Sequence, residues 1–456
     1  MTTAYEQFIR EKSQHTGGDG FEPVDLPEFL YPFQRHLVEW SLRRGRAAIF
    51  ADCGMGKTAM ELVFGDQCVK KTNRPVLLAT PIAVGAQMVQ EAEKFGIEAK
   101  RSRDGKFDGT TCIWITNYEQ LHKFNPADFA AFIGDESSGI KDAKSERKHD
   151  VVEFMRNIRY RLLCTATAAP NDYHELGTSS EALGLLGFRD MITTFFKQET
   201  GKDHKGWGRT KYRFRGHAQE PFWSWVCSWA RSLRKPSDLG FDDAGFDLPP
   251  LIENEIVVSC EKTRDGFLFP LPGRDLQEER QERRNSIDER CDMAAEIAHG
   301  HDGATVLWCE LNDEGDRLAK VVGESKQVKG SMPDEQKEEY LTAFSSGELK
   351  RLIIKPKIGA WGLNWQHCHN VVSFPSHSYE QYYQSVRRCY RFKQQNPVKV
   401  SLIVGEGEAG VLKNIRRKAD QSEHMFKSIV AHMKDAMHLQ TSDYFPESEE
   451  LPQWLA

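Results

Sequence analysis

Residues 51–58 have the types and the order that hold a phosphate chain. They read Ala-Asp-Cys-Gly-Met-Gly-Lys-Thr, follow the apolar run 47–50 and precede a helix-compatible stretch, 59–68. A strand, a glycine-bearing loop and a helix in this order direct backbone N–H groups and the helix N-terminus at phosphate oxygens. The Lys57 ammonium would reach the β and γ oxygens, and the Thr58 hydroxyl would be a ligand of Mg²⁺. Although the strict pattern begins with glycine rather than alanine, we predict phosphate contacts from Gly54, Met55, Gly56, Lys57 and Thr58.

A pair of acids, Asp135 and Glu136, stands 78 residues after Lys57, at the end of the apolar run 130–133. Beside a phosphate loop such a pair has a specific use. Asp135 would hold Mg²⁺ through water, and Glu136 would polarise the water that attacks the γ-phosphate. Two acids at a strand end are common by themselves, so this interpretation depends on the phosphate loop that precedes them.

Apolar runs alternate with helix-like stretches in two series, which predicts an α/β protein with two parallel-sheet lobes. The predicted domains are 1–185 for the first lobe, 186–295 for a mainly helical insertion that does not alternate, and 296–456 for the second lobe with a C-terminal helix. The expected strands are 75–79, 111–115, 129–133 and 161–164, then 304–309, 352–354, 370–374 and 398–404. The expected helices are 84–95 and 148–157, then 313–322, 334–344, 379–390 and 410–437.

Charge is distributed unevenly along the 456 residues, whose formal net charge is −6. Residues 197–235 hold ten Lys and Arg against three acids, a local balance of +7, and four of the ten tryptophans. Cations that neutralise phosphates and rings that stack on bases suit a nucleic-acid contact surface. The alternative is a small folded insertion with solvated charges and a tryptophan core. Trp225 and Trp229, at helical spacing, fit inward packing, whereas Trp207 lies between two glycines.

A second charged run, 274–290, is interpreted as a solvated helix face. The composition, with 39% hydrophobic and 28% charged residues, is typical of a soluble globular protein. We expect neither a membrane span nor a secretion signal, because the chain has no apolar stretch of 18 residues and no apolar signal region at its start. The ten cysteines form no C-x-x-C pair, which indicates free thiols in a reducing cytoplasm.

Together these features resemble the superfamily-two helicases and translocases, most of all the SNF-type branch that moves on double-stranded DNA. The resemblance spans roughly residues 30–434, and its motifs occur in the family's order. Those of the first lobe are Tyr31-Pro32-Phe33-Gln34, Ala79-Thr80-Pro81, Thr116-Asn117-Tyr118-Glu119, and Thr165-Ala166-Thr167 with Pro170-Asn171. Those of the second lobe are Gly359-Ala360-Trp361-Gly362-Leu363-Asn364 and the segment from Gln384 to Gln394, in which Lys393 replaces a usual glycine.

The resemblance implies two RecA-like lobes and specific roles for these residues. Gln34 would read the edge of the adenine, and Gly362 would lie beside the nucleotide at the lobe interface. Arg388 and Arg391, which would share one helix face, would reach the γ-phosphate when the lobes close and stabilise the charge of the transition state. The residues expected to contact nucleic acid are Thr80, Asn117, Thr165 and Thr167, with Trp207, Lys211, Arg213 and Arg215 in the basic region.

The function implied is an ATP- and Mg²⁺-dependent motor that translocates on DNA. Duplex DNA is favoured, branched or single-stranded DNA stays open, and nuclease, replication or recombination proteins are candidate partners. The long gap between lobes favours the SNF-type branch over DEAD-box proteins, which join their lobes with a short linker. A bacterial or phage origin is expected, with a cytoplasmic or nucleoid-associated location. Two alternatives remain: a strand-separating DNA or RNA helicase, and a non-catalytic nucleic-acid-binding scaffold.

Overall fold

The computed structural model describes residues 20–82, 84–170, 172–202, 208–260, 276–359 and 364–442. Seven parallel strands form the first sheet, in the order β3-β4-β2-β5-β6-β1-β9. The central strands are buried along almost their whole length, because helices cover both faces of a parallel sheet. The strands are β1 Arg46–Ala51, β2 Val76–Thr80, β3 Ala99–Arg101, β4 Ile113–Asn117, β5 Ala131–Gly134, β6 Tyr160–Cys164 and β9 Ala230–Leu233.

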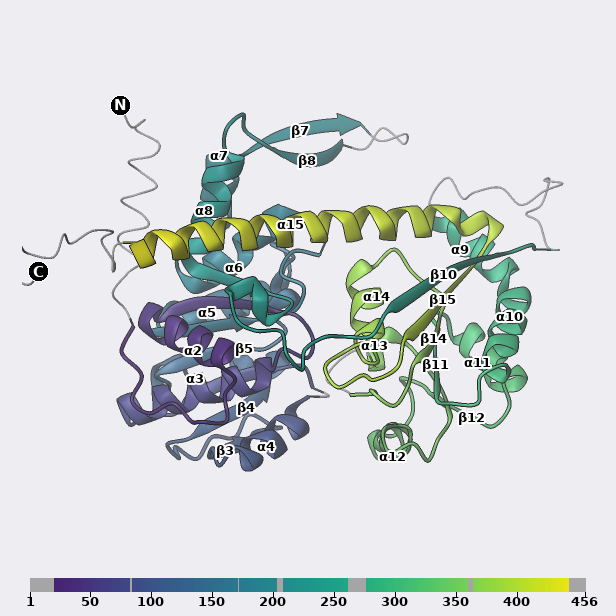
Figure 1. Cartoon of the computed structure of the whole chain (residues 1–456), viewed down its shortest axis with the longest axis horizontal. Coiled ribbons are helices and arrows are strands. Elements are labelled where there is room, and N and C mark those ends of the chain that lie inside the picture. The colour runs from purple at the N-terminus through teal and green to yellow at the C-terminus, as the bar shows by residue number, and fades with distance from the viewer. Residues whose placement is uncertain are drawn as a thin grey trace, which may run out of the picture. The chain divides into compact units, whose positions relative to one another are not determined.

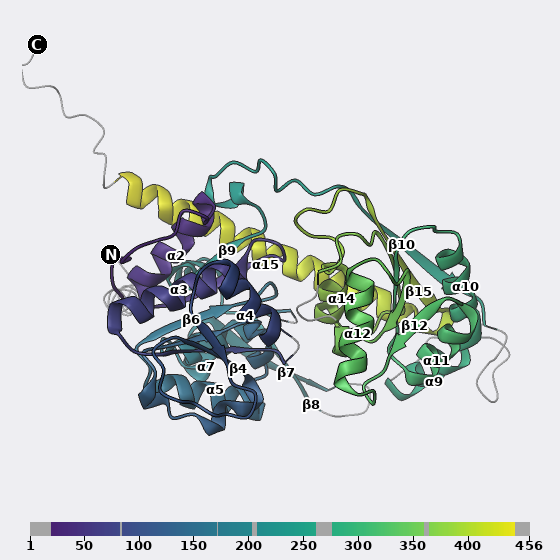
Figure 2. The same ribbon diagram turned by 90° about the horizontal axis from the view of Figure 1, so that it is seen from below.

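Helices lie on both sides of this sheet, and Figure 2 shows α3 and α5 on opposite faces. The α-helices of this part of the chain are α2 Pro32–Arg44, α3 Lys57–Thr72, α4 Gly85–Lys94, α5 Glu146–Arg156, α6 Leu176–Leu183, α7 Phe188–Phe195 and α8 Gln219–Trp229. The short 3-10 helices are η1 Tyr118–Lys123, η2 Pro126–Asp128, η3 Ser137–Ile140, η4 Tyr173–Glu175 and η5 Pro236–Leu239.

An antiparallel hairpin interrupts the α/β pattern between α7 and α8. Its strands are β7 Phe196–Lys202 and β8 Gly208–Phe214, and their register pairs Phe196 with Phe214 at the base. In Figure 1 the hairpin extends away from the sheet, beyond the ends of α7 and α8. After α8 the chain returns to the sheet as its edge strand β9. The hairpin is therefore an insertion between two elements of the first lobe.

A second sheet has six parallel strands in the order β10-β15-β14-β11-β13-β12. Alternate residues of the central strands enter two different cores, as period-two alternation requires: Val306 and Trp308 face one, and Leu307 faces the other. The strands are β10 Leu251–Val258, β11 Thr305–Trp308, β12 Ser325–Val328, β13 Arg351–Ile354, β14 Asn370–Ser373 and β15 Val398–Gly405. The helices are α9 Leu276–Asn285, α10 Ile287–His299, α11 Asn312–Val321, α12 Asp334–Ser345, α13 Pro356–Gly359, α14 Tyr379–Val386, η6 Glu406–Glu408 and α15 Ala409–Ser442.

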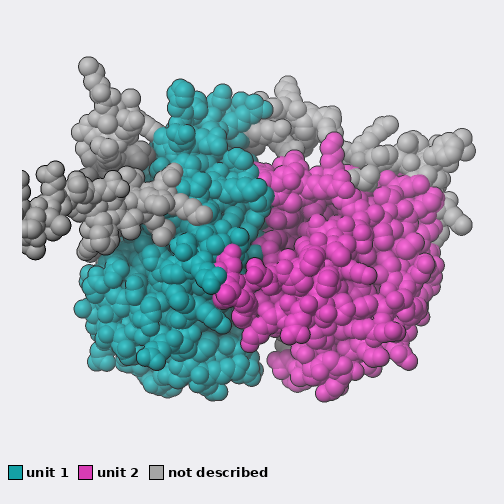
Figure 3. All heavy atoms as spheres, viewed as in Figure 1, with its two compact units in different colours: residues 1–242, 422–456 teal, residues 243–421 magenta. Residues whose placement is uncertain are grey.

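The chain divides into two compact units, coloured separately in Figure 3. Unit 1 comprises Met1–Asp242 and Ser422–Ala456, and unit 2 comprises Asp243–Gln421. The two predicted parallel-sheet lobes are therefore confirmed. The predicted insertion 186–295 is not a unit of its own, because its first part supplies β9 to one sheet and its last part supplies β10 to the other. No helix in the described ranges is long and apolar enough to cross a membrane.

Candidate functional site

Two glycines shape the candidate phosphate loop between β1 and α3. Gly54 and Gly56 have φ angles of 93° and 78°, in the left-handed region that glycine enters without a Cβ clash. A Cβ atom at Gly56 would also stand 2.2 Å from Nε2 of Gln34. The loop therefore needs glycine both for its backbone conformation and for space, and it leads directly into α3 at Lys57.

The buried Gln34 side chain joins the start of α2 to this loop. Its Nε2 donates to the Met55 carbonyl at 3.0 Å, and its Oε1 accepts from the Tyr31 backbone N–H at 3.1 Å. The structure thus brings the residue predicted to read adenine against the predicted phosphate loop, although 21 residues separate Gln34 from Met55 in the sequence. The adenine contact itself stays a prediction.

Lys57 is the first residue of α3, and its ammonium lies inside the loop, where Nζ donates to the Ala51 carbonyl at 2.9 Å. Burial alone would lower the pKa of Lys57, but the acidic groups of Cys53, Glu136 and Asp135 outweigh burial and raise it. The lysine is therefore held protonated next to the two acids, as a cation that binds phosphate oxygens must be.

Asp135 follows β5 directly, at the carboxyl edge of the sheet. Its carboxylate accepts a hydrogen bond of 2.7 Å from the Thr80 hydroxyl at the end of the neighbouring strand β2. Its backbone is held on both sides, since its N–H donates to the Ala79 carbonyl and its own carbonyl accepts from the Tyr118 hydroxyl at 2.6 Å. Burial raises the pKa of Asp135, and the Thr80 hydrogen bond and the Lys57 charge oppose that shift.

Glu136 has a backbone conformation that non-glycine residues rarely adopt, with φ and ψ both 50°. Such a backbone conformation destabilises the folded state by about 1 kcal/mol or more. It is kept only where the surrounding structure imposes it, which is typical of functional sites. The Glu136 carboxylate accepts a hydrogen bond of 3.3 Å from the Thr165 hydroxyl. The same hydroxyl accepts from the Thr167 backbone N–H at 3.1 Å, so the segment after β6 is tied to the candidate catalytic base.

These contacts bear on three residues of the predicted nucleic-acid surface, which stays a prediction. The side chains of Thr80, Thr165 and Thr167 are buried, and the hydroxyls of the first two point at Asp135 and Glu136. A buried hydroxyl that donates to a carboxylate positions that carboxylate and is not exposed to a nucleic-acid strand. Asn117, at the end of β4, is only partly buried, and its contact with nucleic acid stays a prediction.

Glu61 belongs to the same group of charges, and sequence reasoning missed it. It lies on α3 one turn after Lys57, its relative exposure is 0%, and its carboxyl group interacts with Asp135 and with the Cys164 thiol. Burial and the neighbouring Asp135 raise the pKa of Glu61 well above its usual range. The available signal was an acid within the otherwise apolar run 59–64 of a buried helix.

The chemistry of this group fits a nucleotide with a divalent cation. The Thr58 hydroxyl and the Asp135 carboxylate are the oxygen ligands that Mg²⁺ prefers. Asp135, Glu136 and Glu61 all interact electrostatically with the single ammonium of Lys57, so acidic groups outnumber cations within this set. A divalent cation would supply positive charge next to Asp135.

The predicted arginine pair lies in unit 2, directly after α14. The predicted helix 379–390 ends at Val386, so Arg388 and Arg391 sit in consecutive turns and do not share a helix face. The chain leaves the helical path here, and Lys393, in the position of a family glycine, has a φ of 72°. Gln394 holds these turns through hydrogen bonds to three backbone carbonyls, those of Gln366, Cys368 and Cys389.

The two arginines differ in environment. Arg388 is buried, and its Nη2 donates to Gln384 at 3.4 Å. Arg391 is partly exposed and its guanidinium donates to the side chain of Asn364. Gly362, which was predicted to lie near the nucleotide, falls outside the described residues. The catalytic role of both arginines stays a prediction.

The predicted basic surface is partly a hairpin and partly core. Arg213 is exposed on β8 and pairs with Glu199 of β7 at 3.0 Å. Arg215 is exposed at the base, where its Nε donates to the Phe196 carbonyl at 2.9 Å. The α8 tryptophans 223, 225 and 229 are buried, which confirms the inward packing predicted for two of them. Trp207 lies outside the described residues, and of Lys211 only the backbone, paired with Glu199, is described.

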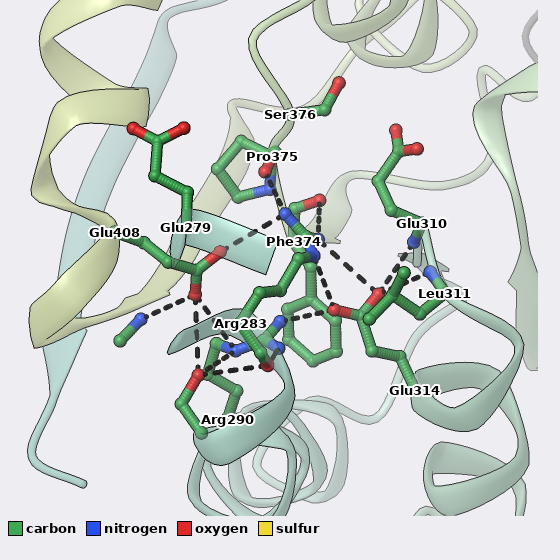
Figure 4. Close-up of polar contacts among 12 residues, drawn as sticks. Glu279, Arg283, Arg290, Glu310, Leu311, Glu314, Phe374, Pro375, Ser376 and Glu408 are labelled. Carbon is green, nitrogen blue, oxygen red and sulfur yellow. Dashed lines mark hydrogen bonds and ion pairs between the residues drawn. The ribbon is translucent and has the colours of Figure 1, made fainter. Parts of the chain in front are cut away.

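The charged run 274–290 differs from its prediction. Arg283 on α9 and Arg290 on α10 are buried, and with Glu314 of α11 and Glu408 of η6 they form the charge cluster of Figure 4. Glu314 Oε1 lies 2.8 Å from a nitrogen of each arginine, and Glu408 lies 3.3 and 3.4 Å from them. The interpretation of this run as a solvated helix face therefore holds for exposed residues such as Arg280 and Arg284, but it is wrong for Arg283 and Arg290.

This charge cluster positions the carboxyl ends of three neighbouring strands. Arg283 donates to the carbonyls of Phe374 and Pro375 after β14, at 3.0 and 2.7 Å. Glu314 accepts from the backbone N–H groups of residues 310 and 311 after β11, and Glu408 accepts from that of residue 405 in β15. Burial would raise the pKa of Glu314, but Arg283 and Arg290 lower it to about 2. Ligands of α/β proteins bind at this edge, so the cluster shapes the loops that would contact one.

Comparisons with known proteins identify part of unit 2. Residues 289–393, which include Arg388 and Arg391, match the family model described as the helicase conserved C-terminal domain. A search of curated proteins finds no match. Among solved structures, the chain is similar to S. cerevisiae Dbp5 bound to RNA and ADP BeF3, with a TM-score of 0.54 and 12% identity, covering 87% of this chain and 93% of that chain. It is also similar to the Sulfolobus solfataricus SWI2/SNF2 ATPase core in complex with dsDNA, with a TM-score of 0.42 and 17% identity, covering 93% of this chain and 97% of that chain.

At 12% identity the likeness to Dbp5 shows the fold alone. The family model shows a helicase conserved C-terminal domain within unit 2. The two parallel sheets agree with that fold, and the second of them contains the matched residues 305–373. The chain therefore combines a fold like that of Dbp5 with a match to the helicase C-terminal domain at residues 289–393.

Proposed function

We propose that this protein is a nucleic-acid-dependent ATPase that uses Mg²⁺ and ATP to translocate on DNA. The observation that carries the proposal is the grouping, within unit 1, of Lys57 in its glycine loop with Asp135 and the strained Glu136. Lys57 would bind the β and γ phosphates, Asp135 would hold Mg²⁺, and Glu136 would orient and deprotonate the attacking water. Bound Mg²⁺ would supply the charge that offsets the developing negative charge on the phosphates.

Arg388 and Arg391 complete the proposed mechanism from unit 2. A guanidinium that reaches the γ-phosphate only in the closed state stabilises the transition state more than bound ATP, and it therefore raises the rate rather than the affinity. Repeated cycles of closure and hydrolysis would move the protein along one strand of a duplex. The exposed cations of the hairpin, Arg213 and Arg215 with Lys211, would give a second contact with the phosphate backbone.

An ATPase titration with single-stranded DNA, duplex DNA and RNA tests the proposal. We expect Mg²⁺-dependent hydrolysis that duplex DNA stimulates most, and we expect it to be lost in Lys57→Ala, which removes the cation at the transferred phosphoryl group. The RNA arm is included because the Dbp5 structure holds RNA. Strongest stimulation by RNA would make the protein an RNA helicase, and equal rates in wild type and Lys57→Ala would refute the nucleotide site.

A second measurement separates movement from strand separation. A translocase displaces the third strand of a triplex without unwinding the duplex, whereas a helicase separates forked strands. Triplex displacement without strand separation is the expected result. No hydrolysis with any nucleic acid, combined with retained binding, would indicate the non-catalytic scaffold.

A further inference from the structure

Tyr173 stands where the segment tied to the candidate catalytic base ends. Thr165 hydrogen-bonds to Glu136, and eight residues later the chain reaches Tyr173, the first residue of η4. Ala168 and Ala169, within this segment, are buried. Up to residue 170 this segment is thus packed into the lobe, and it leads from the Glu136 contact toward Tyr173.

The ring of Tyr173 packs on the base of the hairpin and on α8. It stacks on Phe214 of β8, with centroids 5.8 Å apart and an interplanar angle of 26°, and it meets Trp223 of α8 edge-on at 5.2 Å. Phe214 in turn stacks on Phe196, its register partner on β7, at 4.7 Å. The ring thus rests on Phe214 of β8, which in turn stacks on β7, at the point where the hairpin leaves the lobe.

The next residue, His174, adds a second contact with the same face of the hairpin. Its ring lies 4.7 Å from that of Tyr212, two residues before Phe214 on β8. Residues two apart on a strand point to the same side, so the aromatic face of the hairpin meets η4. The opposite face carries Arg213, whose position alternates with Tyr212 and Phe214. The face that holds the hairpin to η4 and the face that would hold phosphates are therefore on opposite sides of one ribbon.

The hydroxyl of Tyr173 reaches a third element, the C-terminal helix α15. It hydrogen-bonds with Nδ1 of His424 at 3.0 Å. The Arg234 guanidinium, which follows β9, pairs with Glu423 and lies 4.1 Å from the ring centroid of Phe426, so this part of α15 is seated on unit 1 beside Tyr173. One side chain therefore contacts the hairpin, α8 and α15, all of which Figure 1 labels.

We infer that Tyr173 is a positioning residue that couples the nucleotide state of Glu136 and Thr165 to the basic hairpin and to α15. The inference rests on the proposed function, and it adds the contact through which hydrolysis would change the hold on nucleic acid. Tyr173 stands outside the phosphate loop, so its replacement should affect communication rather than nucleotide binding. A coupling role requires that both ends respond to this one side chain, and this requirement can be measured.

The first experiment compares three full-length variants by ATPase and DNA affinity. Tyr173→Ala removes the ring, Tyr173→Phe removes only the hydroxyl, and His424→Ala removes its partner on α15. We expect Tyr173→Ala to keep its DNA-free hydrolysis rate and its DNA affinity while stimulation by saturating DNA falls about fivefold or more. Tyr173→Phe and His424→Ala should each lose a smaller and equal part, and the double variant should lose no more than either. Tyr340→Phe, which removes the hydroxyl that accepts from Gln336 in α12, is the matched control and should equal wild type.

A second experiment measures coupling without DNA, by hydrogen exchange of the β7 and β8 backbone amides with and without a non-hydrolysable ATP analogue. We expect the analogue to change exchange in wild type and in Tyr340→Phe, but not in Tyr173→Ala.

A wild type that DNA does not stimulate, but whose hairpin responds to the analogue, would refute DNA translocation and retain the coupling. An unchanged hairpin in wild type, or wild-type stimulation in Tyr173→Ala, would overturn the inference. A parallel fall of DNA-free rate and melting temperature would show that Tyr173 is only structural; if Tyr173→Ala does not fold, Tyr173→Phe and His424→Ala decide.

Discussion

Two sets of arginines that look alike in the sequence have opposite environments. Arg213 on the hairpin has a side chain that is 65% exposed and pairs with Glu199, which is 39% exposed. Arg290 in unit 2 is fully buried and pairs with Glu314 and Glu408, which are 0% and 2% exposed. Glu199 lies 14 residues from its arginine, whereas Glu408 lies 118 residues away. The density of charge along a chain therefore does not reveal burial, because the acids that permit burial come from distant segments.

The difference also determines what each pair contributes. An exposed ion pair contributes about 0–1 kcal/mol, since water and salt screen it. A buried cation needs its acid, and removal of one partner costs about 3–5 kcal/mol because an unpaired charge stays behind. The hairpin arginines are thus available for a ligand, and the cluster arginines are committed to the fold of unit 2.

The largest effect should come from Glu314→Gln. The variant leaves Arg283 and Arg290 with Glu408 as their remaining acid in the cluster, so we expect the free energy of unfolding to fall by about 3–5 kcal/mol, measured by urea denaturation. Glu199→Gln, at the exposed pair of the hairpin, is the matched control and should change stability by about 1 kcal/mol or less. Equal effects in the two variants would contradict the comparison.

Acid should affect the buried pair in the same sense. The pKa of Glu314 is lowered from 4.5 to about 2, so its ionised form favours the folded state. This stabilisation is present above pH 4.5 and is lost as the pH falls toward 2, and it amounts to about 3 kcal/mol. Urea titrations at several pH values between 6 and 3 should show that the unfolding free energy of wild type approaches that of Glu314→Gln as the pH falls. A constant difference across that range would mean that Glu314 does not titrate with folding.

A third kind of arginine should act on rate rather than on stability. Arg388→Ala and Arg391→Ala should each reduce ATP turnover by about a hundredfold, while the affinity for nucleotide stays close to wild type, because such a group acts mainly on the transition state. Single-turnover hydrolysis and nucleotide binding measured side by side check this. Full hydrolysis with loss of DNA binding would instead assign these arginines to the nucleic-acid path.

The smallest effect on stability should come from the hairpin. Replacement of Lys211, Arg213 and Arg215 with Ala should leave the unfolding free energy nearly unchanged. The slope of log affinity for duplex DNA against log salt should flatten by about 0.9 for each phosphate that the triple variant no longer neutralises. Binding titrations at four salt concentrations measure the slope. A slope equal to that of wild type would show that the hairpin cations do not bind phosphates.

Much of the fold could be predicted because its signals are local. The buried strands β2, β5, β6 and β14 read as apolar runs, and their observed bounds differ from the predicted ones by one or two residues. The edge strands β3, β10 and β12 were not predicted, because they are partly exposed and lack a continuous apolar run. The buried edge strand β9 was missed because Arg231 and Ser232 interrupt its apolar residues. The hairpin was not predicted. Its alternating aromatic and basic residues were interpreted only as a basic, aromatic-rich composition, and not as two strands that pair with each other.

The candidate site divides in the same way. Lys57, Asp135 and Glu136 could be found from types and spacing, because a glycine loop and a strand-end acid pair require specific residues near one another in the chain. The roles of Thr80 and Thr165 could not, since their hydroxyls point at carboxylates 55 and 29 residues away. The shared helix face of the arginine pair was predicted from periodicity, which cannot show that α14 ends at Val386.

The sequence by itself determined the two parallel-sheet lobes, the phosphate loop and the acids beside it, because backbone periodicity and loop conformation depend on neighbouring residues. The tertiary structure alone decided which charges are buried, which hydroxyls orient the acids, and that Tyr173 joins the hairpin to α15. Each of those outcomes depends on side chains brought together from segments far apart, as when the Tyr173 hydroxyl meets His424 across 251 residues of chain. Burial and hydrogen-bond partners are properties of such encounters, and no local pattern encodes them.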